Sequence, residues 1–177
     1  MTERSPAPAG LALIESLVNT LDIGSGRDTL VTADGRRLFG LTVEELPGAL
    51  TLRESLRAAL LAHAGHPPHR EVTPLGELLV DAPLHVTVDP ADGSAALAPA
   101  DSGPLPSRVA AAVAQALVAG TWTRLKACAA DTCHWAYYDR SPAGRGRWCS
   151  MQVCGARAKM RRYRAKEPHP TESSAVT

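Results

Sequence analysis

Four cysteines lie in the last third of the chain, in two pairs with the same internal spacing. Cys128 and Cys133 form the first pair, Cys149 and Cys154 form the second, and the chain has no other cysteine. Four thiolates in two close pairs can complete a tetrahedral zinc shell that leaves no coordination position for water. The spacing therefore predicts one structural Zn²⁺ per chain, bound by these four residues, and a small module that the metal holds together.

Two disulfides or unrelated buried thiols are the alternatives for the same residues. Residues 1–10 lack the apolar run of a secretory signal, and the thiol pool of the cytosol disfavours disulfides. We therefore expect a cytoplasmic protein with a zinc site, and we leave the two alternatives open.

The charge of the chain is divided unevenly along its length. Residues 1–120 contain 8 basic and 14 acidic residues, a net charge of −6, whereas residues 121–166 contain 11 basic and 2 acidic residues, a net charge of +9. This asymmetry favours two separate roles, with a polyanion as the partner of the basic part. No apolar run approaches the about 18 residues of a membrane span, so no membrane partner is expected.

Basic residues concentrate after the last cysteine. Residues 150–166 contain no proline and suit a helix, on which the basic side chains form two neighbouring stripes. Ala156, Met160 and Tyr163 form an apolar stripe that we expect to pack on the zinc core. A basic helix anchored by a metal is typical of nucleic-acid-binding proteins. The residues expected to contact DNA are Arg145, Arg147, Arg157, Lys159, Arg161, Arg162 and Arg164.

Both the charge and the aromatic residues of this module have a second interpretation. A basic helix face is often only solvated, or it contacts an acidic protein surface. Trp135, Tyr137, Tyr138 and Trp148 could stack on bases. We favour packing around the metal for these rings, because about forty residues cannot bury enough surface without large side chains and a metal.

The residues before the module predict a helix-dominated α+β domain with a β-hairpin. Apolar residues recur at helical spacing in several segments and alternate in others, and Thr42 with Glu45 matches a capping box. The expected elements are helices over residues 11–19, 50–64, 74–80 and 106–120 and strands over 84–88 and 94–98. The expected organisation is a flexible tail (1–10), a front domain (11–120), a zinc finger with a terminal basic helix (121–166) and a second tail (167–177).

Two short segments around the second cysteine pair resemble the CGNR zinc-finger family. They are residues 148–151, Trp-Cys-Ser-Met, and residues 154–159, which begin Cys-Gly and continue with Arg157 and Lys159. Residues 124–126, Arg-Leu-Lys, and 138–141, Tyr-Asp-Arg-Ser, also fit. The family motif has Asn where this chain has Ala156. This difference leaves the zinc ligands intact, but the contribution of that Asn to the position of the helix is absent here. The resemblance implies zinc on the four cysteines and a bacterial transcription regulator linked to stress.

The front part is similar to the ABATE domain that typically precedes such fingers. The similar segments are residues 17–20, Leu-Val-Asn-Thr, residues 52–57, which read Leu-Arg-Glu-Ser-Leu-Arg, and the hairpin turn at Asp92 and Gly93. The resemblance implies a domain that senses a small-molecule effector or a stress signal. We expect Asn19 to cap the first helix or to bind backbone, with contact to a ligand as the alternative.

The leading hypothesis is thus a DNA-binding transcription regulator. A homodimer is left open, because paired half-sites would extend the small footprint of one finger on DNA. The alternative is a zinc-dependent protein-interaction or redox-sensing module without direct DNA binding. An enzyme is not expected. His63, His66 and His69 lie in a segment broken by Gly and Pro and predict a surface loop, His85 belongs to a strand, and His134 adjoins a cysteine ligand.

Overall fold

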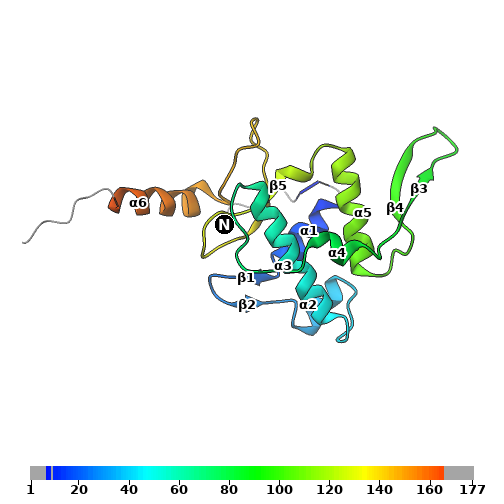
Figure 1. Ribbon diagram of the computed structural model, residues 1–177, viewed down its shortest axis with the longest axis horizontal. Coiled ribbons are helices and arrows are strands. Elements are labelled where there is room, and N and C mark those ends of the chain that lie inside the picture. The colour runs from blue at the N-terminus through cyan, green and yellow to red at the C-terminus, as the bar shows by residue number, and fades with distance from the viewer. Residues whose placement is uncertain (1–6, 9, 166–177) are drawn as a thin grey trace, which may run out of the picture.

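Helices form the centre of the front part (Figure 1). The computed structural model describes residues 7–8 and 10–165, so the tail 167–177, most of the tail 1–10 and Lys166 lie outside the described residues. The front helices are α1 (Leu11–Val18), α2 (Ala33–Leu38), α3 (Leu46–His63), α4 (Leu75–Leu79) and α5 (Leu105–Val118). The hydrophobic core includes apolar side chains of α1, α3 and α5 that are almost wholly shielded from water, among them Ile14, Leu56 and Val109.

The helix starts follow local sequence signals. Thr42 and Glu45 make the two bonds of the predicted capping box: the backbone N–H of Thr42 donates to the Glu45 carboxylate (2.8 Å), and the N–H of Glu45 donates to the Thr42 hydroxyl (3.4 Å). These bonds close the turn before α3, whose N-cap is Glu45 and not Thr42. The helix that follows begins at Leu46, with Pro47 in its first turn, which is earlier than the predicted start at residue 50. Proline is tolerated there because the first N–H groups of a helix have no intrahelical partner.

The predicted hairpin is confirmed as the antiparallel pair β3 (Leu84–Val88) and β4 (Ala95–Pro99), in which Val86 lies opposite Leu97. It projects at the end of the molecule opposite α6 (Figure 1). A second, short hairpin, β1 (Leu21–Asp22) with β2 (Arg27–Asp28), was not predicted from the sequence.

The finger begins with a third hairpin that packs into the front core. A 3-10 turn, η1 (Trp122–Arg124), leads into β5 (Leu125–Ala127), which pairs with β6 (Ala136–Tyr138). Leu125 and Ala136 belong to the same buried cluster as α1 and α3. The fold is therefore the predicted mixture of helices and small hairpins, ending in a zinc-finger region and a helix. Within the described ranges, the structure has no helix both long enough and apolar enough to span a bilayer.

The described part of the chain ends in a helical arm that points away from the front part (Figure 1). A single π-helical turn, η2 (Met151–Gly155), continues into α6 (Ala156–Arg164). The sequence predicted one regular helix over 150–166. The wider turn instead carries Cys154 toward the other cysteines, and such turns are common at functional sites.

Candidate metal centre

The four cysteine thiols converge on one point. Their Sγ atoms all lie within 4.8 Å of one another, with Cys133–Cys149 at 3.6 Å and Cys149–Cys154 at 3.8 Å. A tetrahedral site with Zn–S bonds of about 2.3 Å has sulfur–sulfur edges of about 3.8 Å. All four cysteines are free thiols, with Cys128 and Cys154 buried. The donor set and its spacing therefore fit a tetrahedral thiolate-bound metal with no open position.

The thiols influence one another strongly. The hydrogen bond with Cys133, together with that from Cys149, lowers the pKa of Cys128 to about 2. The hydrogen bond with Cys128 raises the pKa of Cys133 to about 12. Hydrogen bonds of Cys149 with Cys128 and Cys133 raise the pKa of Cys149 far above its usual range. One thiolate forms readily and opposes the next, because like charges at this distance disfavour each other. A divalent cation relieves this repulsion.

A tight turn presents the first cysteine pair. The N–H of Cys133 donates to the carbonyl of Ala130 (2.8 Å), and the N–H of Cys128 donates to the carbonyl of Trp135 (2.9 Å). His134 has φ +47°, in the left-handed region, where residues with a side chain pay a cost of order 1 kcal/mol. Its ring nitrogen Nδ1 hydrogen-bonds the carbonyl of Cys128 at 3.0 Å, so the imidazole belongs to the turn and not to the ligand set.

The second cysteine pair is shaped by a cap and a close contact. The Ser150 hydroxyl accepts a hydrogen bond from the N–H of Val153 (3.3 Å) and thereby caps η2. A Cβ atom on Gly155 would lie 3.1 Å from the sulfur of Met151 and 3.3 Å from the Trp148 ring, so a larger residue there would require these side chains to shift by a few tenths of an ångström. Ala156, at the family Asn position, is exposed at the first residue of α6.

A buried ion pair organises the loop between the two cysteine pairs. The Lys126 ammonium donates to the Asp139 carboxylate (2.9 Å), and both side chains are only 4% exposed. The same carboxylate accepts the N–H groups of Ser141 (3.0 Å) and Gly146 (2.7 Å). Burial acts to raise the pKa of Asp139, but the hydrogen bonds from Lys126 and Ser141 outweigh it and hold the pKa below its usual range. From the sequence, Lys126 was counted in the net charge of the module and in the family resemblance, without a structural role.

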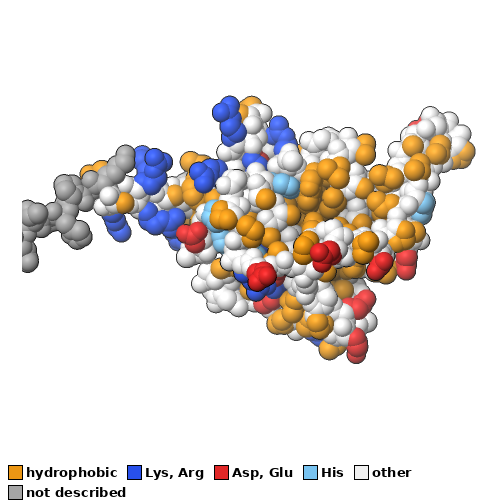
Figure 2. Space-filling view, in the orientation of Figure 1, with side chains coloured by type: hydrophobic (Ala, Val, Ile, Leu, Met, Phe, Trp, Pro, Cys, Tyr) orange, Lys and Arg blue, Asp and Glu red, His pale blue; other side chains and the backbone are white. Residues whose placement is uncertain are grey.

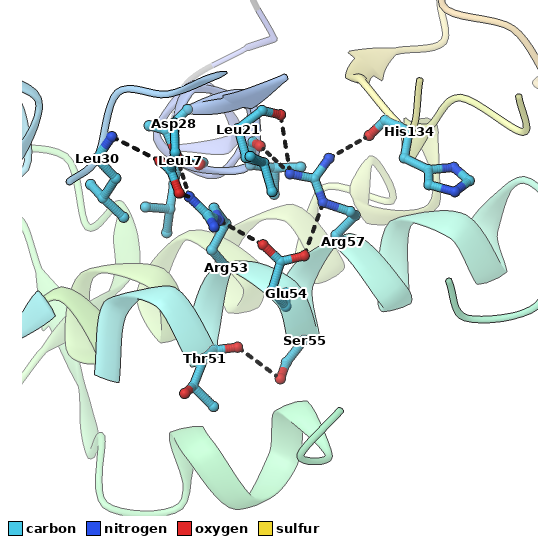
Figure 3. A network of polar contacts seen from close by, with 12 residues as sticks. Leu17, Leu21, Asp28, Leu30, Thr51, Arg53, Glu54, Ser55, Arg57 and His134 are labelled. Atoms are coloured by element: carbon cyan, nitrogen blue, oxygen red, sulfur yellow. Dashed lines mark hydrogen bonds and ion pairs between the residues drawn. The ribbon is translucent and has the colours of Figure 1, made fainter. Parts of the chain in front are cut away.

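A polar network joins the front helices to the turn that carries the first cysteine pair, residues 128–135, here called the metal turn (Figure 3). Arg57 of α3 is fully buried, and its guanidinium donates to the carbonyls of His134 (2.8 Å) and Val18 (2.8 Å). Arg57 also pairs with Glu54 (3.2 Å), which pairs with Arg53 (2.7 Å). Burial alone would raise the pKa of Glu54, but Arg57 and Arg53 hold it below its usual range.

Asn19 adds a second connection between the two parts. Its side-chain amide donates to the carbonyl of Ala136 (3.0 Å), and its carbonyl oxygen accepts the N–H of Ala136 (2.7 Å). The predicted backbone-binding role of Asn19 is thus met by a strand of the finger. The segments 17–20 and 52–57, which sequence analysis linked only through a family resemblance, meet at this junction.

The predicted DNA-contacting residues are all exposed, five on α6 and two in the loop 139–147. Figure 2 shows Lys and Arg side chains gathered around α6 and the adjacent loop, whereas Asp and Glu lie mostly over the front part. One expectation is wrong: the stripe of Ala156, Met160 and Tyr163 does not pack on the metal core. Met160 is 51% and Tyr163 62% exposed, and α6 buries no residue. The thiols pack instead against Ala130 and Trp148.

His63 and His69 make hydrogen bonds within the fold. His63 is the last residue of α3, within the helix predicted over 50–64 and before the loop, and its Nδ1 hydrogen-bonds the carbonyl of Leu125 (2.8 Å). His69 contacts Glu54 (2.9 Å), and His85 is exposed on β3 as predicted. Among the described residues, the four cysteines form the only group of three or more His, Cys, Asp or Glu side chains close enough to hold a metal ion.

This geometry defines a zinc-finger class of site, built from two cysteine pairs on short hairpin and helix segments. The model of the CGNR zinc finger family matches residues 124–167. The chain thus carries a CGNR zinc finger whose four cysteines are positioned to bind a metal. No curated protein matches the chain.

Proposed function

We propose that the protein is a transcription regulator that binds duplex DNA through α6, with Zn²⁺ as the metal on the four cysteines. The observation that carries this proposal is that α6 extends freely and bears cations on two sides. Arg157, Arg161 and Arg164 line a groove on one side of the helix. Lys159 and Arg162 line a groove on the other side. Such a helix can meet two rows of phosphates at once.

The dimensions of α6 favour duplex DNA among polyanions. A single helix, including its side chains, is about 10–12 Å wide, and the major groove of B-form DNA is about 12 Å wide, so the helix fits the groove. The major groove of duplex RNA is too deep and narrow for such an approach. Phosphate contacts supply affinity and registration, while base contacts supply specificity. Arg145 and Arg147, in the loop ordered by Asp139, are available for further phosphate contacts.

The front domain is proposed to receive a small-molecule or stress signal, and two copies of the chain are proposed to bind paired half-sites. The alternative, a redox-sensing or protein-interaction module, is favoured by two observations. Cys133 and Cys149 are only partly buried, so oxidants can reach them, and Met151 is 71% exposed beside them. Release of zinc by mild peroxide, reversed by a reductant, with no DNA binding, would support this alternative.

The direct test measures binding to duplex DNA, duplex RNA and single-stranded DNA by fluorescence anisotropy. If about six cations meet phosphates, log affinity falls with log salt at a slope of about −5. The double variant Arg161→Glu/Arg164→Glu should lose at least about tenfold in affinity, because it removes two phosphate contacts and adds repulsion.

The matched control is Arg27→Glu/Arg37→Glu, which makes the same charge change at exposed positions of the front part. Zinc content and circular dichroism must stay unchanged in both variants. DNA binding that is insensitive to salt, or that both double variants weaken equally, would contradict the role of α6. Equal affinity for duplex RNA would contradict insertion into the major groove.

A further inference from the structure

The turn that carries Cys133 is held by a residue of the front domain. His134 follows this cysteine in the left-handed backbone region, with φ +47°, which side-chain-bearing residues seldom adopt. The Arg57 guanidinium donates to its carbonyl through Nη1 (2.8 Å) and to the carbonyl of Val18 through Nη2 (2.8 Å). One buried side chain therefore ties the end of α1 to the metal turn (Figure 3).

Asn19 holds the other side of the same turn. Its amide exchanges two hydrogen bonds with the backbone of Ala136, at 3.0 and 2.7 Å, three residues beyond Cys133. The two attachments end on the backbone of His134, in the turn, and of Ala136, the first residue of β6, on either side of Trp135. Packing of the finger against α3 alone would not require either contact.

We propose that Arg57 and Asn19 are positioning residues of the metal centre, so that the front domain sets the affinity of the finger for its metal. Groups that orient metal ligands from outside the ligand set contribute to metal affinity. Coupling between two sites is reciprocal, so metal binding in turn stabilises the front helices. A ligand that moves α1 relative to α3 would thereby change the metal site. The inference rests on the proposed metal site and not on DNA binding.

The test compares full-length wild type with Asn19→Ala and Arg57→Lys. Zn²⁺ affinity is measured by competition with a chromophoric chelator, and Co²⁺ spectra report the geometry of the thiolate site. We expect each variant to bind Zn²⁺ about 10- to 100-fold more weakly. Far-ultraviolet circular dichroism follows mainly the front helices, and the rise in their melting temperature on adding Zn²⁺ should shrink in both variants.

Val109→Ala is the control, because Val109 is fully buried in α5 and its truncation weakens the front core without touching the metal turn. It should lower the melting temperature with and without metal and leave the Zn²⁺ affinity unchanged. Asn19→Ala leaves the buried charges intact. If Arg57→Lys prevents folding, the Zn²⁺ affinity of Asn19→Ala alone decides the test. Zn²⁺ affinities of the folded variants within about threefold of the Val109→Ala value would overturn the inference. A wild-type chain that binds no metal would instead contradict the metal site.

Discussion

The base of the finger, which is the hairpin of β5 and β6 with the loop after it, has its strands buried against the front domain, whereas the terminal helix α6 is not buried. At the base, β5 and β6 lie in the core of the front domain, and Lys126, Asp139 and Arg57 are almost wholly buried. In α6, no side chain is buried. An isolated helix of this length is marginal in water, so α6 depends for its stability on the attachment of its first turn at Cys154.

This difference shows that equal formal charges have unequal roles within one module. Lys126 and Arg124 turn inward and donate to the Asp139 carboxylate and to loop carbonyls, whereas the cations of α6 face solvent. A count of charges along residues 121–166 therefore overstates the charge offered to a partner. Substitutions at the base should affect stability, and substitutions on the helix should affect binding.

The largest effect is expected from loss of a metal ligand. Cys154→Ser should abolish stoichiometric metal binding, because a hydroxyl is a poor zinc ligand and the remaining three thiols leave the shell open. Structural zinc contributes about 10–16 kcal/mol of apparent binding free energy in small fingers, so the finger should lose its ordered structure. Elemental analysis should find one zinc per wild-type chain and none in the variant. A variant that retains zinc at full occupancy would contradict the four-thiolate site.

A smaller loss should follow substitution of the buried lysine. Lys126→Met leaves the Asp139 carboxylate buried without its cation, which costs about 3–5 kcal/mol in the free energy of unfolding. Lys159→Met, on the exposed face of α6, should change the free energy of unfolding by less than about 0.5 kcal/mol while weakening DNA binding. Urea denaturation of both variants checks the contrast. Equal destabilisation by the two substitutions would remove the distinction between base and helix.

The smallest effect is expected in the pH dependence of stability at the Asp139 carboxylate. The folded-state pKa of Asp139 lies below its unfolded value, so its hydrogen bonds stabilise the fold above about pH 4, and this contribution is lost as the pH falls through the folded pKa. Asp139→Asn should therefore cost on the order of 2 kcal/mol near neutral pH, and the difference from wild type should narrow below about pH 4. Urea midpoints of both proteins across this range provide the measurement. A difference that stays constant with pH would show that the charge of Asp139 is not responsible.

The sequence predicted the features that depend on local spacing. The cysteine pairs, the hairpin of β3 and β4, and α1 and α5 follow from short-range patterns, and the structure contains them. Helical periodicity shows which side chains share a face, but not whether another element lies nearby, so the stripe of Met160 and Tyr163 was wrongly assigned to a core. The roles of Arg57 and Lys126 were missed because their partners are brought to them only by the tertiary fold.

The absence of any buried side chain in α6 has a consequence for divergence among such proteins. Core residues are constrained by their neighbours, and a change in one demands a change in another. The outward side chains of α6 carry no such constraint, provided that the helix still forms behind Gly155. If α6 binds DNA as proposed, target preference can change by single substitutions in this segment without loss of the scaffold, and exchanging the segment between related chains should transfer that preference.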